Sequence, residues 1–314
     1  MRRLLFYRDY HRFTGGHLKF WDYYNHVRAS GLYQPELVFS ADSVWDASNP
    51  WLPVRESVLM EPLSFRPDAL FLGGMDWANA AGLIANASDV PILNLIQNVT
   101  HADPGPLRDF LKNKAVRICV SSEVADAVRG TGEVNGPLYV IANGLAVDKL
   151  PAPRTLAQRD IDLLVVGNKA PKLAELIVPQ LKALGINFKA LLERTPRGEF
   201  LDWINRARVT LFLPRKREGF YLPQMEGMAL ETVVVCADCV GNRSFAQHGV
   251  NCFKPEGGPQ AMVKSAQQAL ALAPAPREAM LAAGRATAAA HSMARERAAF
   301  LKILVDLQGL WRAI

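Results

Sequence analysis

Two glutamates, Glu218 and Glu226, flank a short segment whose residue types could bind a negatively charged ligand. Gly219 permits a turn, and Pro223 is favoured in the first turn of a helix, where its missing N–H group leaves no donor unsatisfied. Glu226 should then lie one turn into the helix, and Glu218 on the loop before it. Amide groups at a helix start bind anions because they meet the positive end of the helix dipole. The segment therefore predicts a phosphate site with an acid on each side, which suits a sugar nucleotide.

Two further groups of residues follow predicted strands in the first half of the chain. Gly15 and Gly16 allow the backbone to approach a ligand closely, although an ordinary turn can have the same sequence. His101 ends the run that begins at Gln97. We interpret it either as a polar group aimed into a binding site or as a structural histidine.

A lysine-rich turn follows the first predicted strand of the second half. Lys169 and Lys172 lie beside Gly167 at a predicted helix start and suit a diphosphate, the alternative being ordinary surface lysines. The GxGxxG fingerprint and the Walker A loop are absent from the sequence. Their absence argues against a dinucleotide oxidoreductase and a P-loop ATPase.

Short apolar strands alternate with helical stretches along the whole chain. We predict strands at 4–7, 37–39, 69–72, 92–96, 117–120 and 139–141 and, after a linker at 149–154, at 162–166, 188–192, 209–213 and 232–236. Strands separated by helices indicate parallel sheets covered on both faces. We predict an α/β protein with two Rossmann-like domains, 1–150 and 151–297, that face a cleft. Ligands should bind at the carboxyl ends of the strands, and 298–314 should form an amphipathic helix.

Composition indicates a globular protein without a membrane span. Of 314 residues, 50% are hydrophobic and 21% charged, and no apolar run reaches the roughly 18 residues that a span needs. The N-terminus lacks the features of a signal peptide, so we expect a cytoplasmic location. We interpret the cysteines as structural thiols, because one CxxC without a second pair does not make a zinc site. They are Cys119, Cys236, Cys239 and Cys252.

The net charge of +6 is concentrated near the N-terminus. Residues 1–28 contain Arg2, Arg3, Arg8, Arg12, Lys19 and Arg28 but only two acidic residues. This excess is either a solvated basic face or a surface attracted to an anionic acceptor or to the anionic inner face of a membrane. Without a basic and aromatic stripe, nucleic acid is not an expected partner.

Taken together, these residues resemble a known family. The stretch from Glu218 to Glu226 (Glu-x7-Glu), the run Ile141-Ala142-Asn143-Gly144, the pair Ser121-Ser122 and the early Gly15-Gly16 are similar to glycosyltransferase family 4. Its members are retaining enzymes of the GT-B fold. The resemblance is strong over about residues 117–254, and before them it rests on the glycine loop and the strand rhythm. It implies that the helix at 298–314 packs back on the first domain.

The resemblance also implies roles for individual residues. Glu218 would bind hydroxyls of the donor sugar beneath the anomeric carbon, and Glu226 would bind the ribose hydroxyls of the nucleotide. The backbone between them would wrap the sugar and the phosphates, which makes donor-binding residues of Gly219, Phe220, Tyr221, Leu222 and Pro223. Glu231 stands where the family often has a glycine after this helix, which puts the usual tight end of the helix in doubt.

Other residues would complete the donor site. Lys172 resembles the phosphate-binding lysine of the family, and Lys169 lies near the position that an arginine usually holds. Gly15 and Gly16 would add to the diphosphate site from the opposite domain. His101 resembles the family's histidine in the cleft and is assigned with Glu218 as catalytic, although Gln97 competes for its position.

The reaction implied is a retaining transfer of a sugar from a nucleotide-diphosphate sugar to a saccharide, lipid-linked or small-molecule acceptor. Lysines and helix-start amides would stabilise the charge that develops on the leaving diphosphate, which is electrostatic catalysis. We therefore predict that neither a metal nor another cofactor is required. The alternatives are a non-catalytic protein that binds nucleotide sugars and a sugar-nucleotide epimerase of the same architecture.

Overall fold

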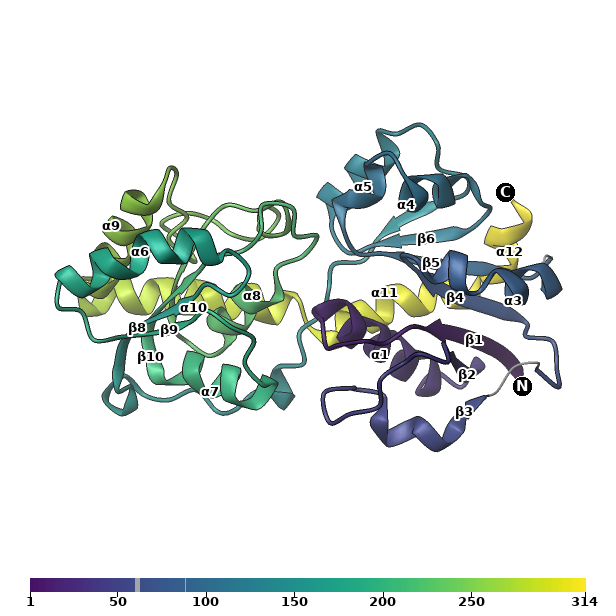
Figure 1. The fold of residues 1–314 in the computed structure, drawn as a ribbon, viewed down its shortest axis with the longest axis horizontal. Helices are drawn as coiled ribbons and strands as arrows, with labels where there is room; N and C mark the ends of the chain where they lie inside the picture. Colours follow the sequence, from purple (N-terminus) through teal and green to yellow (C-terminus); the bar gives the residue numbers. More distant parts are fainter. Residues whose placement is uncertain (60–62, 88) are drawn as a thin grey trace. The chain divides into compact units, whose positions relative to one another are not determined.

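The chain divides into two compact units (Figure 1). The computed structural model describes residues 1–59, 63–87 and 89–314. The first unit comprises Met1–Asn143 and Ala294–Ile314, and the second comprises Gly144–Met293. Residues 144–150, which the sequence analysis placed in the first domain, lie in the second unit. The Leu145 N–H group donates there to the His291 carbonyl at 2.7 Å, and Leu145 forms a β-bridge with Ser292.

The described residues of the first unit form a parallel sheet with the strand order β3-β2-β1-β4-β5-β6-β7. Its strands are β1 (Arg2–Arg8), β2 (Tyr33–Phe39), β3 (Val58–Leu59), β4 (Ala69–Gly73), β5 (Ile92–Ile96), β6 (Val116–Cys119) and β7 (Leu138–Val140). Each strand predicted for this half is present. Strand β3 was not predicted, because two residues are too few to show a strand pattern.

Helices cover both faces of this sheet. They are α1 (Gly15–Arg28), α2 (Asp76–Asn79), α3 (Ala81–Asn86), α4 (Pro106–Asp109), α5 (Ser122–Arg129), α11 (Met293–Val305) and α12 (Leu307–Arg312), with short 3₁₀ turns η1 (Leu52–Ser57), η2 (Val99–Ala102) and η3 (Phe110–Lys112). Side chains on successive strand positions point to opposite faces. On one face the stacked rings of Phe6 and Phe71, 4.6 Å apart, meet Tyr23 of α1, which contacts Phe300 of α11 at 4.8 Å. On the other face Leu5 and Leu72 pack with residues of α2, α3 and α12.

The C-terminal segment is held on the first unit by a buried ion-pair network. Glu296 of α11 lies 2.6 Å from Lys19 Nζ and 3.0 Å from His26 Nε2, both on α1. The single helix predicted at 298–314 is wrong in its bounds, because α11 begins at Met293 and the chain breaks at Asp306 before α12. The apolar spacing that suggested one helix continues across that break.

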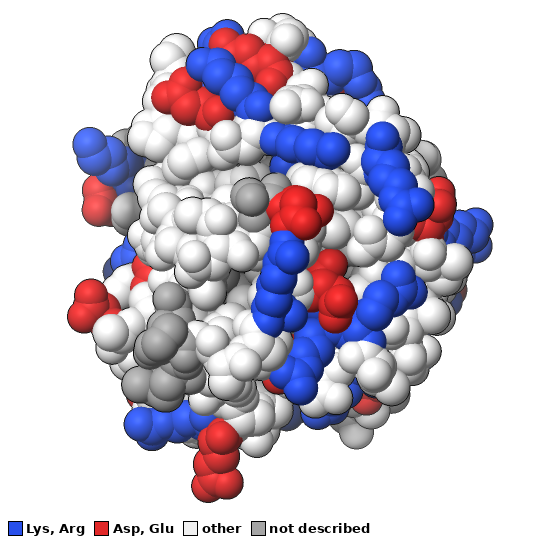
Figure 2. Space-filling view, turned by 90° about the vertical axis from the view of Figure 1, so that its right-hand side faces the viewer, with Lys and Arg blue, Asp and Glu red and all other residues white. Residues whose placement is uncertain are grey.

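Two of the basic residues near the N-terminus are buried and do not contribute to the surface. Arg8 is buried with Asp76, at 2.7 Å between Nη1 and Oδ2, and Lys19 is buried with Glu296. Two of the six positive charges are thus neutralised inside the unit. Figure 2 shows a face on which Lys and Arg are interspersed with Asp and Glu. Among the described residues, no helix is both long enough and apolar enough to cross a membrane.

The described residues of the second unit form a smaller parallel sheet with the order β11-β10-β8-β9. Its strands are β8 (Ile161–Val166), β9 (Phe188–Leu191), β10 (Ala207–Phe212) and β11 (Val233–Cys236), all of them predicted. Its helices are α6 (Pro171–Ala183), α7 (Arg197–Arg206), α8 (Leu222–Ala229), α9 (Pro259–Leu270) and α10 (Pro274–Ala290), with 3₁₀ turns η4 (Val147–Lys149), η5 (Leu156–Gln158) and η6 (Val240–Asn242).

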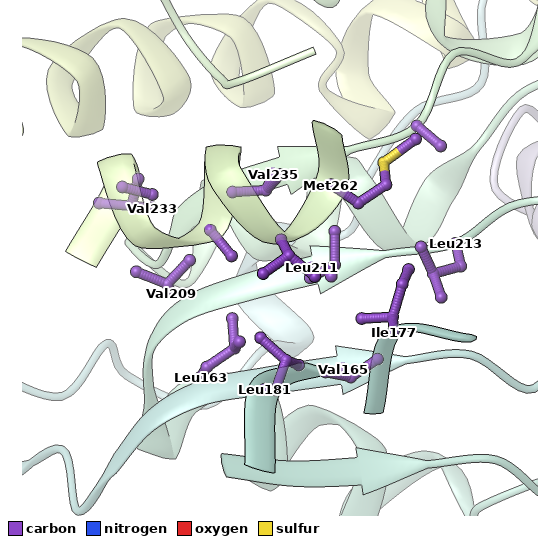
Figure 3. Packing of buried hydrophobic residues seen from close by; sticks show 14 of the residues in the cluster. Leu163, Val165, Ile177, Leu181, Val209, Leu211, Leu213, Val233, Val235 and Met262 are labelled. Atoms are coloured by element: carbon purple, nitrogen blue, oxygen red, sulfur yellow. The ribbon is translucent and has the colours of Figure 1, made fainter. Parts of the chain in front are cut away.

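The core of the second unit explains where α8 lies. On one face of the sheet, Figure 3 shows Ile177 of α6 and Met262 of α9 packed toward Leu211 of β10. The opposite face is covered in part by α8, whose Gly227 packs against the sheet. A Cβ atom there would lie 2.9 Å from the Phe212 ring, so glycine is required for this close approach. The residue before it, Glu226, is thereby fixed beside the carboxyl end of β10.

Candidate functional site

Lys169 and Glu218 meet at the carboxyl ends of two neighbouring strands. Lys169 follows β8 and Glu218 follows β10, and their Nζ and Oε2 atoms are 2.8 Å apart. Gly167 lets α6 start close to the strand, because a Cβ atom there would lie 2.6 Å from the Ala174 side chain. Lys169 Nζ also lies over the Tyr221 ring, 5.2 Å from its centroid. The sequence placed these two residues in separate motifs, and the fold brings them together.

Glu226 is the buried acid of the site. It lies in the first turns of α8 with 1% of its surface exposed. Its Oε1 is 2.6 Å from Nη2 of Arg197, whereas its Oε2 is buried without a hydrogen-bond partner among the described residues. A buried carboxylate oxygen without a partner is costly, so this oxygen is available to accept a hydrogen bond from a ligand or a water.

Arg197 is a site residue that the sequence analysis missed. It begins α7, after β9 and the segment 192–195. A cation at a helix start is electrostatically unfavourable, because it faces the positive end of the dipole. That local mismatch is the signal in the sequence that could have identified it. The charge of Arg197 is offset by the carboxylate of Glu226.

Tyr221 lies between the two acids. Burial raises the pKa of its phenol well above the usual value, and the nearby Cys236 thiol and the carboxylates of Glu218 and Glu226 raise it further. The phenol therefore stays protonated. The rings of Tyr221 and Phe212 are in edge contact, with 6.0 Å between their centroids.

A second loop supports the segment between the glutamates, and the sequence analysis missed this loop as well. The Gly241 carbonyl accepts from the Tyr221 N–H group at 2.9 Å. A Cβ atom on Gly241 would lie 2.6 Å from the Phe220 amide nitrogen, so no other residue fits there. Asn242 Nδ2 donates to Gln224 Oε1 at 2.9 Å inside α8. These roles depend on contacts between residues that lie far apart in the sequence, so no local sequence pattern identifies them.

The remaining predicted donor residues of this unit have varied environments. Lys172 is exposed on the first turn of α6. The Leu222 N–H group donates to the Phe220 carbonyl at 3.2 Å, so the amides of Tyr221 and Leu222 are both satisfied within the protein. Phe220 packs against the Phe245 ring at 5.2 Å. Gly219 lies in the turn after Glu218, and Pro223 occupies the second position of α8.

Gly16, Gln97 and His101 line one cavity of about 260 Å³ in the first unit. Gln97 Nε2 donates to the Gly16 carbonyl at 3.3 Å, so both candidates for the predicted cleft position face the same space. Burial, and then the Arg117 guanidinium, lower the pKa of His101 to about 4. His101 is therefore neutral at pH 7. Gly15 is the first residue of α1 and does not line this cavity.

The same cavity is lined by an ion pair that the sequence analysis did not identify as part of a site. The Arg8 guanidinium contacts Asp76 and, at 2.9 Å, His17 Nδ1, and it lies over the Phe20 ring at 3.8 Å. Burial raises the pKa of Asp76 to about 6 despite Arg8, and burial together with Arg8 lowers the pKa of His17 to about 3. The cavity is thus lined by the Arg8–Asp76 pair, by the neutral His17 and His101, and by Asp9.

No group of three or more His, Cys, Asp or Glu side chains in the described parts of the chain could hold a metal ion. The sequence Asp160-Ile161-Asp162 is an Asp-x-Asp, but it stands at the amino end of β8, away from the loops that carry Glu218. Asp160 pairs with Arg206 and Asp162 with Arg208. The four cysteines are free and buried, as expected of structural thiols. Burial, followed by Glu218, raises the pKa of the Cys239 thiol to about 12.

Comparisons with known proteins identify the class of this fold. Residues 145–271 match the family model described as Glycosyl transferases group 1. Over 98% of its length the chain is similar to a glycosyltransferase from Rickettsia africae (TM-score 0.74, 12% identity, 98% of that chain). It is also similar to sucrose-phosphate synthase from Thermosynechococcus elongatus, with a TM-score of 0.73 and 11% identity over 98% of this chain and 100% of that chain. HepE from Anabaena, solved with UDP-glucose, is similar as well, with a TM-score of 0.76 and 12% identity over 98% of this chain and 100% of that chain.

These comparisons confirm the predicted α/β fold with parallel sheets. At such identities the structural likeness establishes the α/β architecture that the proteins share. A comparison with curated proteins finds no match.

Proposed function

We propose that the protein is a glycosyltransferase that uses a nucleotide-diphosphate sugar and retains the configuration of the transferred sugar. The observation that carries the proposal is the buried carboxylate of Glu226. Arg197 holds one of its oxygens, and the other has no hydrogen-bond partner among the residues that the structure describes. The hydroxyl groups of a ribose are donors that match such an oxygen. The family match over residues 145–271 and the similarity to HepE, which was solved with UDP-glucose, support a donor of this class.

The other residues of the second unit take roles that follow from their positions. Glu218, at the carboxyl end of β10, would accept hydrogen bonds from the donor sugar and lie beneath its anomeric carbon. Two lysines would bind the diphosphate. They are Lys169, which pairs with Glu218 at 2.8 Å in this structure, and the exposed Lys172. Gly219, Phe220 and the start of α8 would enclose the phosphates.

The chemistry needs little from the protein beyond charge stabilisation. A nucleoside diphosphate is already a good leaving group, so the main task is to stabilise the charge that develops on it. The ammonium groups of Lys169 and Lys172 can do this without a divalent ion. The leaving phosphate would take the proton of the acceptor hydroxyl while the new bond forms on the same face of the sugar.

The acceptor in this proposal is a saccharide, free or linked to a lipid. Among the similar structures, HepE was solved with UDP and glucose, and the pneumococcal O-GlcNAc transferase GtfA with UDP and GlcNAc. The proposal includes a cytoplasmic location. A peripheral contact with an anionic membrane would depend on the exposed Arg2, Arg12 and Arg28, since Arg8 and Lys19 are neutralised within the first unit. The roles of Gly15, Gly16 and His101 at the donor stay predictions.

The test is to incubate the protein with UDP-glucose and a panel of saccharide acceptors and to follow the products by NMR. We expect release of UDP, slow without an acceptor and faster with the right one, and a product with the α-configuration of the donor. Nucleotide-sugar binding without turnover would indicate a binding protein. Conversion of the sugar without cleavage from UDP would indicate an epimerase.

A further inference from the structure

A second cavity of about 550 Å³ lies in the second unit, away from the residues assigned to the donor. Its wall includes Arg159, which precedes β8, Arg208 near the start of β10, and Arg277 in the first turn of α10. Glu218 and Lys169 follow the carboxyl ends of the same two strands. The amino ends and the carboxyl ends of parallel strands lie at opposite ends of a sheet. This cavity is therefore separate from the candidate donor site.

The cavity gathers four arginines: Arg154, Arg159, Arg208 and Arg277. Two have carboxylate partners, since Arg154 pairs with Asp202 at 2.8 Å and Arg208 with Asp162 at 3.1 Å. The two acids that also line the cavity, Glu231 and Glu278, both pair with Arg285, at 3.1 and 2.7 Å.

The other two arginines contact only carbonyl oxygens among the described residues. Arg159, 4% exposed, donates to the carbonyls of Arg154, Ala207 and Leu230 at 3.2, 2.6 and 2.7 Å. Arg277 donates to the Leu270 carbonyl at 3.2 Å. Burial lowers the pKa of both guanidinium groups. Glu231 opposes this shift at Arg159, whereas Arg154 and Arg277 add to it, and Arg208 adds to the shift at Arg277. Like charges brought together in this way favour an anion between them.

The rest of the lining is aliphatic. Leu156, Leu272, Pro274 and Leu281 supply apolar surface beside the guanidinium groups. A cavity with a cationic part and an aliphatic part fits a ligand that has both a charged head and a short apolar group. Among the described residues, the arginines that line the cavity or pair with its acids outnumber the acids there by one, 5 − 4 = 1, so the cavity favours an anion. A phosphate monoester, with a charge of about −1.5 to −2 near pH 7, is such an anion.

We propose that this cavity binds a small organic phosphate monoester with a short aliphatic part. Arg277 and Arg159 compensate its charge, and Arg208 and Arg154 add hydrogen bonds from the rim. Guanidinium groups bind phosphate through paired, geometrically fixed donors. The proposal does not depend on the reaction at the donor site.

n-Butyl phosphate is the probe that tests this site. Isothermal titration into the full-length protein should show one site. Inorganic phosphate should bind more weakly than butyl phosphate by about four-fold for each methylene that the cavity buries, because a buried methylene contributes about 0.8 kcal/mol. Butyrate, with one negative charge, should also bind more weakly.

Variants separate this cavity from the donor site. Arg277→Gln should weaken butyl phosphate binding by at least about ten-fold, since it removes a charged hydrogen-bonding partner. Arg208→Gln, an exposed substitution that the fold should tolerate, should weaken it by only a few-fold, because Asp162 already offsets that charge. Lys172→Gln in the donor loop and Lys264→Gln on the exposed side of α9 serve as controls and should leave binding unchanged. UDP binding should be the same in all variants except Lys172→Gln.

The proposal is overturned if butyl phosphate fails to bind the wild-type protein. It is equally overturned if binding is lost in Lys172→Gln and kept in Arg277→Gln and Arg208→Gln, because the phosphate would then occupy the donor loop. Melting temperatures of the variants without ligand establish that each is folded.

Discussion

Arg197 and Glu226 form an ion pair at the carboxyl edge of the second sheet, with 2.6 Å between Nη2 and Oε1. The pair joins the start of α7 to the first turns of α8. Because Glu226 is buried and Arg197 half-exposed, the arginine fixes one carboxylate oxygen and leaves the other, Oε2, directed at no protein donor among the described residues. A carboxylate fixed in this way is prepared to accept hydrogen bonds from a ligand before the ligand arrives, which reduces the cost of ordering on binding.

Replacement of Glu218 by alanine should lower turnover more than donor affinity. In the proposed function its carboxylate lies beneath the reacting carbon, so its contribution should be larger in the transition state than in the ground state. Steady-state kinetics with UDP-glucose should show a reduced kcat and a KM close to that of the wild type. Glu175→Gln, on the exposed face of α6, is the control. A raised KM with an unchanged kcat would assign Glu218 to ground-state binding instead.

Removal of divalent metal should leave the activity unchanged. The charge on the leaving diphosphate is assigned to Lys169 and Lys172, whose ammonium groups replace the electrostatic role that a metal ion has elsewhere. The measurement is UDP release after treatment with EDTA and desalting. Loss of activity that manganese restores would contradict the assignment.

Stability should fall as the pH drops below about 6.5, in part because of His101. Its pKa is lowered from 6.5 to about 4 in the folded protein, mainly by burial. Between these values the unfolded chain binds a proton that the folded protein does not, so the contribution is complete above 6.5 and declines as the pH falls toward 4. At about 1.36 kcal/mol per pKa unit, His101 alone accounts for about 2 kcal/mol of lost stability at about pH 5.

The substitution His101→Gln tests this contribution. The difference in the free energy of unfolding between about pH 8 and about pH 5 should be smaller in the variant by about 2 kcal/mol, whatever its absolute stability. The same pH difference in both proteins would show that His101 is readily protonated in the folded state.

Glu231 should be replaceable by glycine with a gain in stability. It follows α8 and, among the described residues, is the non-glycine residue with a positive φ, 57°. Left-handed backbone costs an ordinary residue about 1–2 kcal/mol, whereas the half-exposed pair of Glu231 with Arg285 contributes about 0.2–1 kcal/mol. Urea denaturation should therefore show Glu231→Gly to be more stable by up to about 1 kcal/mol.

Glu231→Gln is the matched control for this prediction. It removes the charge but keeps the backbone requirement, so it should be no more stable than the wild type. If glutamine and glycine have equal effects, the ion pair and not the backbone determines the stability at this position.

The fold could be predicted from sequence because its information is local. Apolar runs such as 92–96 and 162–166 identify strands wherever they occur, and their alternation with helices implies parallel pairing. Elements without such a pattern were missed or misjudged: β3 has two residues, and the apolar spacing of 298–314 continues across the break at Asp306.

The candidate site was predictable only where a motif was contiguous. The segment from Glu218 to Glu226 carries its own glycine turn and helix start, so its local structure follows from the sequence. Arg197, Gly241 and Asn242 act on that segment from other parts of the chain, and no local pattern links them to it. Glu231 was noticed as a departure from glycine, and its positive φ gives the physical reason why glycine would fit there.

Titration of UDP into the wild-type protein and into Glu226→Ala tests the central claim most directly. Hydrogen bonds to a charged group are worth roughly 1.5–3 kcal/mol, so loss of this carboxylate should weaken UDP binding by about ten- to one-hundred-fold. Glu175→Gln should bind UDP as the wild type does. UDP affinity that is unchanged in Glu226→Ala, or absent in the wild type, would contradict a nucleotide-sugar site built around this glutamate.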